Sequence, residues 1–145
     1  MMRLEDRHNY VRYCRPNQIA DNGKILSAAF VLRKKNPKLN RSKDETELSV
    51  DWFEYFKRDH YKRIKSALAK RLTISQAGKL AKLNCGRTKA AILHQFKFEI
   101  YIEVVDKSYA HLLGLYENQK EDTEILLLDL FLNQIDEVKS IGEIT

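Results

Sequence analysis

The chain contains 145 residues, of which 43% are apolar, five are Gly and two are Pro, a composition that favours one folded domain over residues 1–145. Its longest apolar run, 125–132, is broken by Asp129 and is shorter than the roughly 20 residues that span a bilayer, so we expect no membrane partner. The first residues lack the apolar core of a signal peptide, and Cys14 and Cys85 do not make a disulfide framework, which favours a cytoplasmic location.

The formal charge of +6 is unevenly distributed along the chain. Residues 1–98 carry 23 Lys and Arg against 9 Asp and Glu, a net charge of +14, whereas residues 99–145 carry 3 against 11, a net charge of −8. A strongly basic first part suggests a polyanionic partner such as nucleic acid. The same asymmetry also fits an acidic end that folds back on the basic part, within one chain or across a dimer.

The first elements that the sequence predicts are two strands joined by a turn. Residues 1–9 are polar, and we expect them to be loosely ordered. Residues 10–15 alternate enough for a short strand that Pro16 ends. Asp21-Asn-Gly23 is a strong turn signal, and residues 24–33 then predict a largely buried strand, so a hairpin is plausible.

Residues 34–44 form a loop on composition, and this loop is strongly basic. With the residue before it, the segment contains Arg33, Lys34, Lys35, Lys38, Arg41 and Lys43. Such a loop can follow a phosphate backbone, but the composition slightly favours a solvated hairpin tip. It contains no aromatic residue, so base stacking would have to come from elsewhere.

The sequence next predicts a short strand end at 47–50 and then an amphipathic helix. Ser49 or Asp51 would cap this helix, which would end near 70–72. Its apolar face would hold Trp52, Phe53, Phe56, His60, Ile64, Ala67 and Leu68. Its basic residues, Lys57, Arg58, Lys62, Arg63 and Lys65, fall mostly elsewhere. The pattern predicts a helix with an aromatic end in the core and a basic face in water.

The next segment predicts two strands. Residues 79–83 favour a strand, 84–86 a turn, and 87–94 either a short helix or a loop. Residues 96–104 alternate strictly between apolar and polar side chains, which indicates an antiparallel sheet with one solvated side. A turn at 106–110 follows.

The end of the chain predicts a short apolar piece at 111–115, a polar loop at 117–122 and a last helix over 123–138, capped by Asp122. Apolar residues nearly encircle this helix, so we expect it to be buried on two sides, and a homodimer seam is one explanation. The seam would use Ile125, Leu128, Phe131, Leu132 and Ile135. A strand at 126–132 is the competing interpretation. Together the elements predict an α+β fold: an antiparallel sheet of about four to five strands, with the main helix and the C-terminal helix packed on one face.

The sequence offers little catalytic chemistry. It has no glycine-rich phosphate loop, no metal-ligand spacing and no cofactor motif. Cleavage of RNA needs only groups that titrate near neutral pH beside positive charge, so His111, with Ser108, Tyr109 and a basic neighbour such as Arg87, is a candidate site. A histidine that only fixes the turn by hydrogen bonding is the alternative. His60, on the apolar helix face, fits a hydrogen-bonded core histidine better.

Five runs of residues carry a resemblance to a known family. They are Arg12-Tyr-Cys-Arg-Pro16, Ala29-Phe-Val-Leu-Arg33, Leu48-Ser-Val-Asp-Trp-Phe-Glu-Tyr-Phe56, Leu83-Asn-Cys-Gly86 and Asp106-Lys-Ser-Tyr-Ala-His111. In this order they resemble a family of small uncharacterised bacterial proteins. The resemblance implies a bacterial origin and a single cytoplasmic domain, and no activity. In similar sequences we expect Pro after the aspartate and His at the place of Tyr109, so Lys107 and Tyr109 weaken a catalytic role for this motif.

The leading functional hypothesis is a non-enzymatic binding module whose basic surface engages nucleic acid through its phosphates. The candidate contact residues are Arg33, Lys34, Lys35, Lys38 and Arg41 in the loop, with Lys57, Arg58, Lys62 and Arg63 on the helix. One alternative is a protein-interaction or accessory subunit that dimerises through its C-terminal helix. The other is a metal-independent ribonuclease that uses His111.

Overall fold

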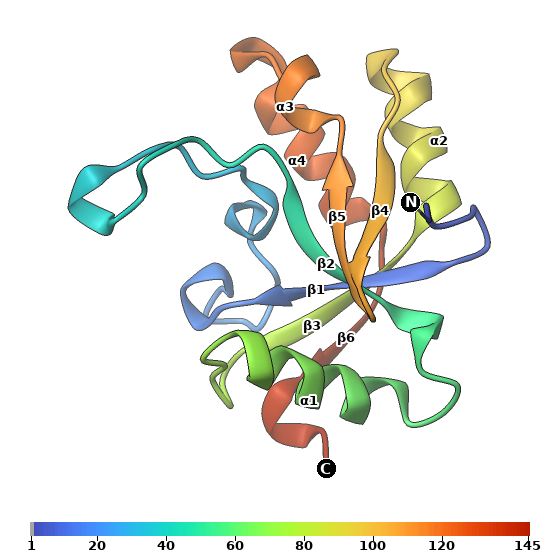
Figure 1. Ribbon diagram of the computed structural model, residues 1–145. Coiled ribbons are helices and arrows are strands. Elements are labelled where there is room, and N and C mark those ends of the chain that lie inside the picture. Colours follow the sequence, from blue (N-terminus) through green and yellow to red (C-terminus); the bar gives the residue numbers. More distant parts are fainter. Residues whose placement is uncertain (1) are drawn as a thin grey trace.

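The computed structural model, which describes residues 2–145, is built on a six-stranded antiparallel sheet with strand order β4-β5-β2-β1-β3-β6 (Figure 1). The strands are β1 (Asn9–Cys14), β2 (Leu48–Trp52), β3 (Lys79–Asn84), β4 (Tyr101–Asp106), β5 (Tyr109–Leu113) and β6 (Ile135–Ser140). The helices are α1 (His60–Arg71), α2 (Cys85–Phe96), α3 (Leu115–Asn118) and α4 (Glu124–Asn133). The predicted α+β class is confirmed, with six strands rather than four to five. Within residues 2–145 no helix is long and apolar enough to cross a membrane.

Helices cover both faces of the sheet, so the expectation that they share one face is wrong. Ile64 of α1 packs with Val11 and Leu80 in a small core on one side. The larger core on the other side contains Tyr10 and Phe131, with residues of α2 and α4. Because successive side chains of a strand point to opposite faces, β1 contributes Tyr10 to one core and Val11 to the other. The sequence therefore encodes two apolar faces on the same central strands.

The predicted long helix is correct only from its middle onward. Residues 48–52 form β2, which pairs with β1 and β5, residues 53–55 form a turn of 3₁₀ helix, and α1 begins at His60. The aromatic residues that suggested one helix face meet because the chain folds back: the rings of Phe53 and His60 stack with centroids 4.5 Å apart. Pairing with two neighbouring strands therefore overrides a helical pattern that the side chains also satisfy.

The turn at 21–23 is confirmed, but the predicted strand at 24–33 is wrong. Gly23 has φ +87°, a conformation that glycine adopts without steric cost. After it the chain forms only a single bridge, between Ile19 and Ile25, and a 3₁₀ turn at Ser27–Phe30. The predicted burial is confirmed only in part: Ala29, Phe30 and Leu32 are buried, and the Phe30 ring stacks on that of Phe131, whereas Leu26 is 41% exposed.

Local capping explains two further corrections around α2. The Asn84 side chain accepts a hydrogen bond from the Arg87 N–H at 2.9 Å, so residues 84–86 begin a helix instead of a turn. The helix at 87–94 is confirmed and extends to Phe96. Lys97 then adopts a left-handed conformation with φ +62°, which ends α2 and delays β4 to Tyr101.

The C-terminal helix α4 ends at Asn133, and residues 135–140 form β6 at the edge of the sheet beside β3. Its apolar surface is largely used within the chain. Phe131 is fully buried and Leu128 is 8% exposed, whereas Ile125 is 75% exposed. The homodimer seam expected on this helix therefore loses Leu128 and Phe131 to the core, and Ile135 belongs to β6 instead of the helix. Leu132 is half-buried against the same core.

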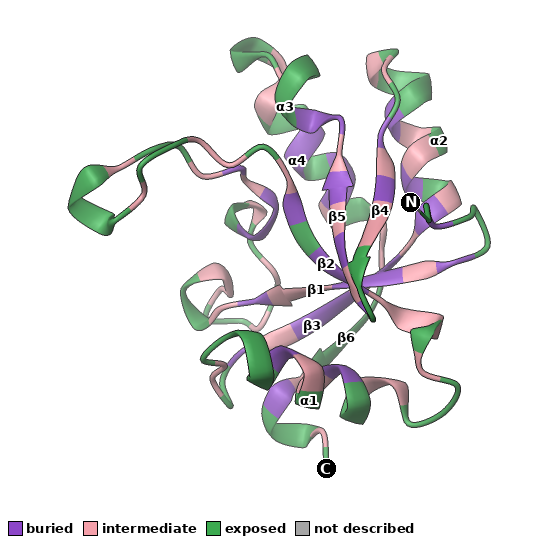
Figure 2. Cartoon of the chain, viewed as in Figure 1, coloured by how far each residue is buried: buried purple, intermediate pink, exposed green. Residues whose placement is uncertain are grey.

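Residues 33–45 form an arm that projects from the body, as the loop prediction expects (Figure 1). A bridge between Asn36 and Arg41 and a hydrogen bond from the Glu45 N–H to the Arg33 carbonyl, at 2.8 Å, join its two sides. Most of its surface is exposed (Figure 2). The arm is therefore held by its own hydrogen bonds and carries its charges outward.

We expect Phe131→Ala to lower the free energy of unfolding by about 3–5 kcal/mol, because it leaves a cavity in the larger core. Ile125→Ala on the same helix should change the free energy of unfolding by less than about 0.5 kcal/mol, because that side chain faces water. Urea denaturation of both variants measures the difference. Equal effects would contradict the assignment of α4 to the core.

Candidate nucleic-acid interface

An ion pair with one buried partner, Asp51, holds the candidate interface together. Asp51 of β2 is 2% exposed, and its Oδ1 lies 2.7 Å from Nη2 of Arg71, the last residue of α1. Arg71 Nη1 also donates to Asp51 Oδ2 at 3.2 Å, and Ser108 Oγ donates to the same oxygen at 2.8 Å. This network joins β2, the end of α1 and the turn between β4 and β5. A buried carboxylate needs such partners, because leaving it unpaired costs several kcal/mol.

The network forms one wall of a groove between α1 and the β4–β5 turn, which we call the α1 groove. It has a volume of about 500 Å³, within the size range of ligand sites. Its lining residues are Tyr55, Phe56, Arg63, Ser66, Ala67, Lys70, Arg71, Asp106, Lys107, Ser108 and Tyr109. Arg63, Lys70 and Lys107 are exposed, and none of them forms a salt bridge with another residue of the described chain. The groove therefore combines uncompensated positive charge with aromatic rings.

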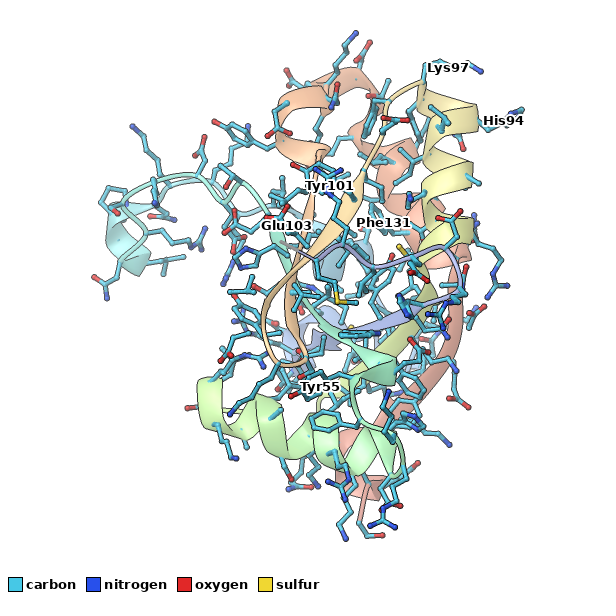
Figure 3. All side chains as sticks on the ribbon, turned by 45° about the vertical axis from the view of Figure 1, so that its right-hand side comes forward. Tyr55, His94, Lys97, Tyr101, Glu103 and Phe131 are labelled. Atoms are coloured by element: carbon cyan, nitrogen blue, oxygen red, sulfur yellow. The ribbon has the colours of Figure 1, made fainter. Side chains whose placement is uncertain are left out.

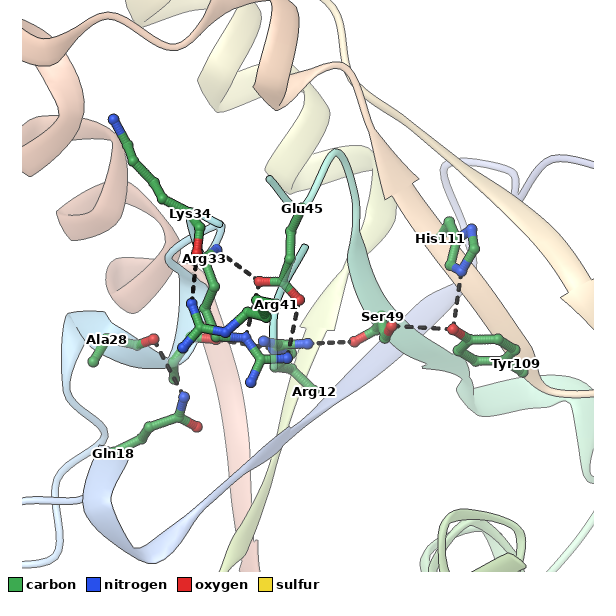
Figure 4. Close-up of polar contacts among 11 residues, drawn as sticks. Arg12, Gln18, Ala28, Arg33, Lys34, Arg41, Glu45, Ser49, Tyr109 and His111 are labelled. Atoms are coloured by element: carbon green, nitrogen blue, oxygen red, sulfur yellow. Dashed lines mark hydrogen bonds and ion pairs between the residues drawn. The ribbon is translucent and has the colours of Figure 1, made fainter. Parts of the chain in front are cut away.

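A second, smaller hollow adjoins the α1 groove and shares Arg71 with it. We call it the arginine hollow; its volume is about 90 Å³. Its lining residues are Arg12, Tyr13, Arg15, Gln18, Arg33, Glu45, Ser49, Asp51, Leu68, Arg71 and Leu72. It opens where β1 and β2 separate, because these strands pair only at Tyr10 with Trp52 and at Val11 with Asp51. Beyond that point the Arg12 guanidinium fills the space and donates to the backbone oxygens of Ser49 and Ala29 (Figure 4).

A polar cluster lies on the sheet surface between the two hollows. Tyr109 Oη lies 2.9 Å from His111 Nε2 and 3.1 Å from Ser49 Oγ, within hydrogen-bond distance of both (Figure 4). The Arg71 guanidinium lies over the Tyr109 ring at 4.2 Å from its centroid. The cluster thus places a hydroxyl, an imidazole and a cation at one surface. These are groups that can transfer a proton and stabilise charge near a phosphate.

The predicted catalytic group is only partly assembled. Tyr109 and His111 meet, but Ser108 is buried and donates to Asp51. Arg87 lies on α2, which belongs to the other side of the sheet, and forms a salt bridge with Asp136 of β6. His60 stacks on Phe53, which agrees with a structural role.

The predicted phosphate contacts fall into two groups. On the arm, Lys34, Lys35 and Lys38 are exposed and form no salt bridge with described residues, whereas Arg33 is bound by both Glu45 oxygens at 3.0 Å. Arg41 donates to the Lys34 carbonyl at 2.7 Å. Arg33 is thus a structural residue of the arm as well as a cation.

The second group lies on and before α1. Lys57 and Arg58 precede the helix, and Lys62 and Arg63 lie in its first turns; all four are exposed. Figure 1 shows the arm and α1 at separate ends of the molecule. The arginine hollow connects them, because Arg33 at the base of the arm and Arg71 at the end of α1 both line it.

The sequence analysis missed the residues that make this connection. Lys70, Arg71 and Lys107 were not selected, although all three line the α1 groove. The sequence could have indicated Arg12. On a strand with a period of two residues, Arg12 shares a face with Tyr10 and Cys14, which are buried. An arginine at an inward-facing position is a rare event that requires partners.

The structure shifts the pKa values of three groups, two thiols and one carboxyl, in opposite directions. Burial raises the pKa of Cys14 to about 11, and burial likewise raises the pKa of Cys85 to about 11, so both thiols are neutral and weak nucleophiles. Burial alone would raise the pKa of Glu45, but its hydrogen bonds to Arg33 and the Arg33 and Arg12 charges lower the pKa below its usual value. Among the residues that the structure describes, no three His, Cys, Asp or Glu side chains are grouped to hold a metal ion.

The fold and site define a small α+β domain with a basic, aromatic-lined surface. Comparison of the chain with models of known protein families, with curated proteins and with solved structures found no match. The functional argument therefore rests on the geometry of this chain.

Arg71→Met should lower the free energy of unfolding by about 3 kcal/mol, because it leaves the buried Asp51 carboxylate without its counter-charge. Glu45→Gln breaks the pair with Arg33, whose side chains are 29% and 41% exposed, respectively. It should lower the free energy of unfolding by about 1 kcal/mol or less. Urea denaturation at neutral pH compares the two. An equal cost would contradict the central role of Asp51.

The contribution of Glu45 to the free energy of unfolding should depend on pH in a defined way. Because its folded pKa lies below the ordinary value of 4.5, the stability difference between wild type and Glu45→Gln should be complete above that pH and disappear as the pH falls through the folded pKa. A difference that grew on acidification would contradict the Arg33–Glu45 assignment.

Proposed function

We propose that this chain is a non-enzymatic binding module whose basic surface engages nucleic acid through its phosphates. The observation that carries the proposal is the α1 groove, where Arg63, Lys70 and Lys107 face the same space as the rings of Tyr55 and Tyr109. Lysine and arginine contacts to phosphate provide affinity without sequence readout. Lys35 and Lys38 of the arm are exposed and add positive charge beyond the groove, whereas Lys34 lines a hollow with several carboxylates.

The aromatic rings favour a single strand over a duplex. Tyr55 is 37% exposed and lines the groove, so its ring is available to a base. In a duplex each base is already covered by its neighbours, whereas unpaired bases stack on aromatic side chains for about 1–3 kcal/mol each. The sequence analysis found no aromatic residue in the basic loop, and the fold supplies it from the segment before α1.

The groove contains one carboxylate, Asp106, among its cations. Arg71 does not add free charge, because Asp51 neutralises it. The unpaired cations therefore outnumber the unpaired carboxylate, which keeps the groove attractive to phosphates. Arg71 instead stiffens the groove by lying against the Tyr109 ring.

Binding to a labelled single-stranded oligonucleotide should weaken steeply as salt is raised. Lys70→Glu should weaken binding at low salt roughly fivefold or more and should reduce the magnitude of the salt slope by roughly 0.7, the effect of one phosphate contact on a single strand. Fluorescence anisotropy across a salt series measures both quantities.

Lys97→Glu is the matched control, because it makes the same charge change on a residue at the end of α2, away from Tyr55 (Figure 3). It should leave affinity nearly unchanged. Affinity that does not depend on salt, or that falls equally in the two variants, would refute binding at the α1 groove.

A second candidate function is metal-independent cleavage of bound RNA, which the contact between Tyr109 Oη and His111 Nε2 favours. An imidazole can take the proton of a 2′-hydroxyl, whose oxygen then attacks the adjacent phosphorus. The 5′-oxygen would leave with a proton from water, giving a cyclic phosphate and a 5′-hydroxyl end. The nearby cations would stabilise the charge that develops on the phosphate.

If the chain cleaves RNA, His111→Ala should abolish cleavage in the presence of EDTA while binding is retained. Arg87→Ala should cleave as wild type does, because Arg87 pairs with Asp136 away from this cluster. Gel analysis of RNA and of the DNA of the same sequence tests both points. Intact RNA after prolonged incubation with wild-type protein would remove this candidate.

A further inference from the structure

The arginine hollow has properties that phosphate-backbone binding in the α1 groove does not explain. Four arginines from three parts of the chain line it: Arg12 and Arg15 from β1 and the residue after it, Arg33 from the arm and Arg71 from α1. Four guanidinium groups so close together repel one another, so the folded chain needs negative charges nearby to offset this repulsion. The question is therefore how many of the four are neutralised within the chain.

Two of the four have a carboxylate partner. Arg33 binds Glu45 at 3.0 Å and Arg71 binds Asp51 at 2.7 Å. Neither Arg12 nor Arg15 forms a salt bridge with any residue from 2 to 145. The hollow therefore keeps two positive charges in excess of its carboxylates.

The Arg12 guanidinium also has unused hydrogen-bond donors. It donates through Nε to the Ala29 oxygen at 2.9 Å and through Nη1 to the Ser49 oxygen at 2.8 Å. A guanidinium has five N–H donors, so the group has capacity left for an anion. Burial lowers the pKa of Arg12 most, the Cys14 and Glu45 charges raise it, and the Arg15 and Arg33 charges lower it, in agreement with the closeness of the three arginines in the hollow.

We propose that the arginine hollow binds one phosphate dianion, and that in the nucleic-acid complex this group is the terminal phosphomonoester of the bound strand. The second half of this statement rests on the proposed function. Its two excess positive charges match a dianion, whereas an internal phosphodiester carries one negative charge. A hollow of about 90 Å³ is far smaller than the α1 groove, so it admits a phosphate group but not a nucleotide.

The position of the hollow agrees with a strand end. It shares Arg71 with the α1 groove, so a strand whose nucleotides lie in the groove can place its terminal phosphate beside Arg12 and Arg15. The Ser49 hydroxyl, which is exposed at the same hollow, adds a neutral donor. Arginine recognises phosphate well because its planar fork donates in pairs.

Arg15 is the residue to change, because Arg12 also ties β1 to the Ser49 and Ala29 carbonyls and its loss would disturb the fold. Wild type and Arg15→Gln would be titrated with three oligonucleotides of one sequence: one with hydroxyl ends, one with a 5′-phosphate and one with a 3′-phosphate. For wild type, one of the two phosphorylated ends should tighten binding about tenfold or more, the effect of one charge-assisted hydrogen bond. Arg15→Gln should lose this preference and bind the hydroxyl-ended strand as wild type does.

Arg63→Gln is the matched control in the α1 groove. It should weaken all three strands by the same factor and keep the preference for the terminal phosphate. Inorganic phosphate provides a test that needs no strand: at matched ionic strength it should raise the melting temperature of wild type more than chloride does, and the gain should shrink in Arg15→Gln.

The outcomes separate the two proposals. Equal affinity for the three strands, together with no specific stabilisation by phosphate, would overturn the phosphate site. Stabilisation by phosphate without binding of any strand would support the site and refute the proposed function. Stabilisation by phosphate with equal affinity for all three strands would overturn the assignment to a strand end and leave free phosphate as the ligand.

Discussion

The ion pair between the buried Asp51 carboxylate and Arg71 is the interaction on which the candidate interface depends. It is the point where the sheet, the end of α1 and the β4–β5 turn meet, since Ser108 donates to the same carboxylate. Without it α1 would still be held to the sheet by Ile64 and Leu68, but the shared wall of the two hollows would have no fixed position. Asp51 needs this contact, because its carboxylate is only 2% exposed. If it lost Arg71, water could not replace the lost hydrogen bonds at low free-energy cost.

Part of the positive charge of residues 1–98 is neutralised by salt bridges with the acidic end of the same chain. Its acidic end contributes to salt bridges with the basic part, such as Arg87 with Asp136 and, at 4.0 Å, Lys82 with Glu137. These pairs lie at β6, the edge strand beside β3. The α1 groove lies elsewhere and keeps its lysines without a salt bridge among the residues described, whereas Lys34 at the base of the arm lines a hollow together with Glu117 and Glu121 of the acidic end. The two interpretations of the asymmetry therefore apply to different surfaces of one molecule.

The early separation of β1 and β2 has a functional consequence. Two paired positions are enough to align the strands, and the opening beyond them is filled by a guanidinium instead of a ladder of hydrogen bonds. Arg12 satisfies the free carbonyl of Ser49 and at the same time brings a positive charge to the surface of the sheet. The backbone geometry and the electrostatics of the arginine hollow thus have the same origin. Tyr109 and His111, on the neighbouring strand β5, complete the polar surface next to it.

The sequence by itself determined the class of fold, the strands β1 and β3, the basic arm and the uneven charge. These are local properties: a period of two, a Pro or Asn at a strand end and a run of lysines need no distant partner. Only the tertiary structure decided that residues 48–52 pair in the sheet, that helices cover both faces and that Phe131 belongs to the core. It also decided which arginines are neutralised, because Arg71 and Asp51 are 20 residues apart and meet only when α1 packs on the sheet. Pairing between distant residues leaves no period in the sequence, so the candidate site became visible only in three dimensions.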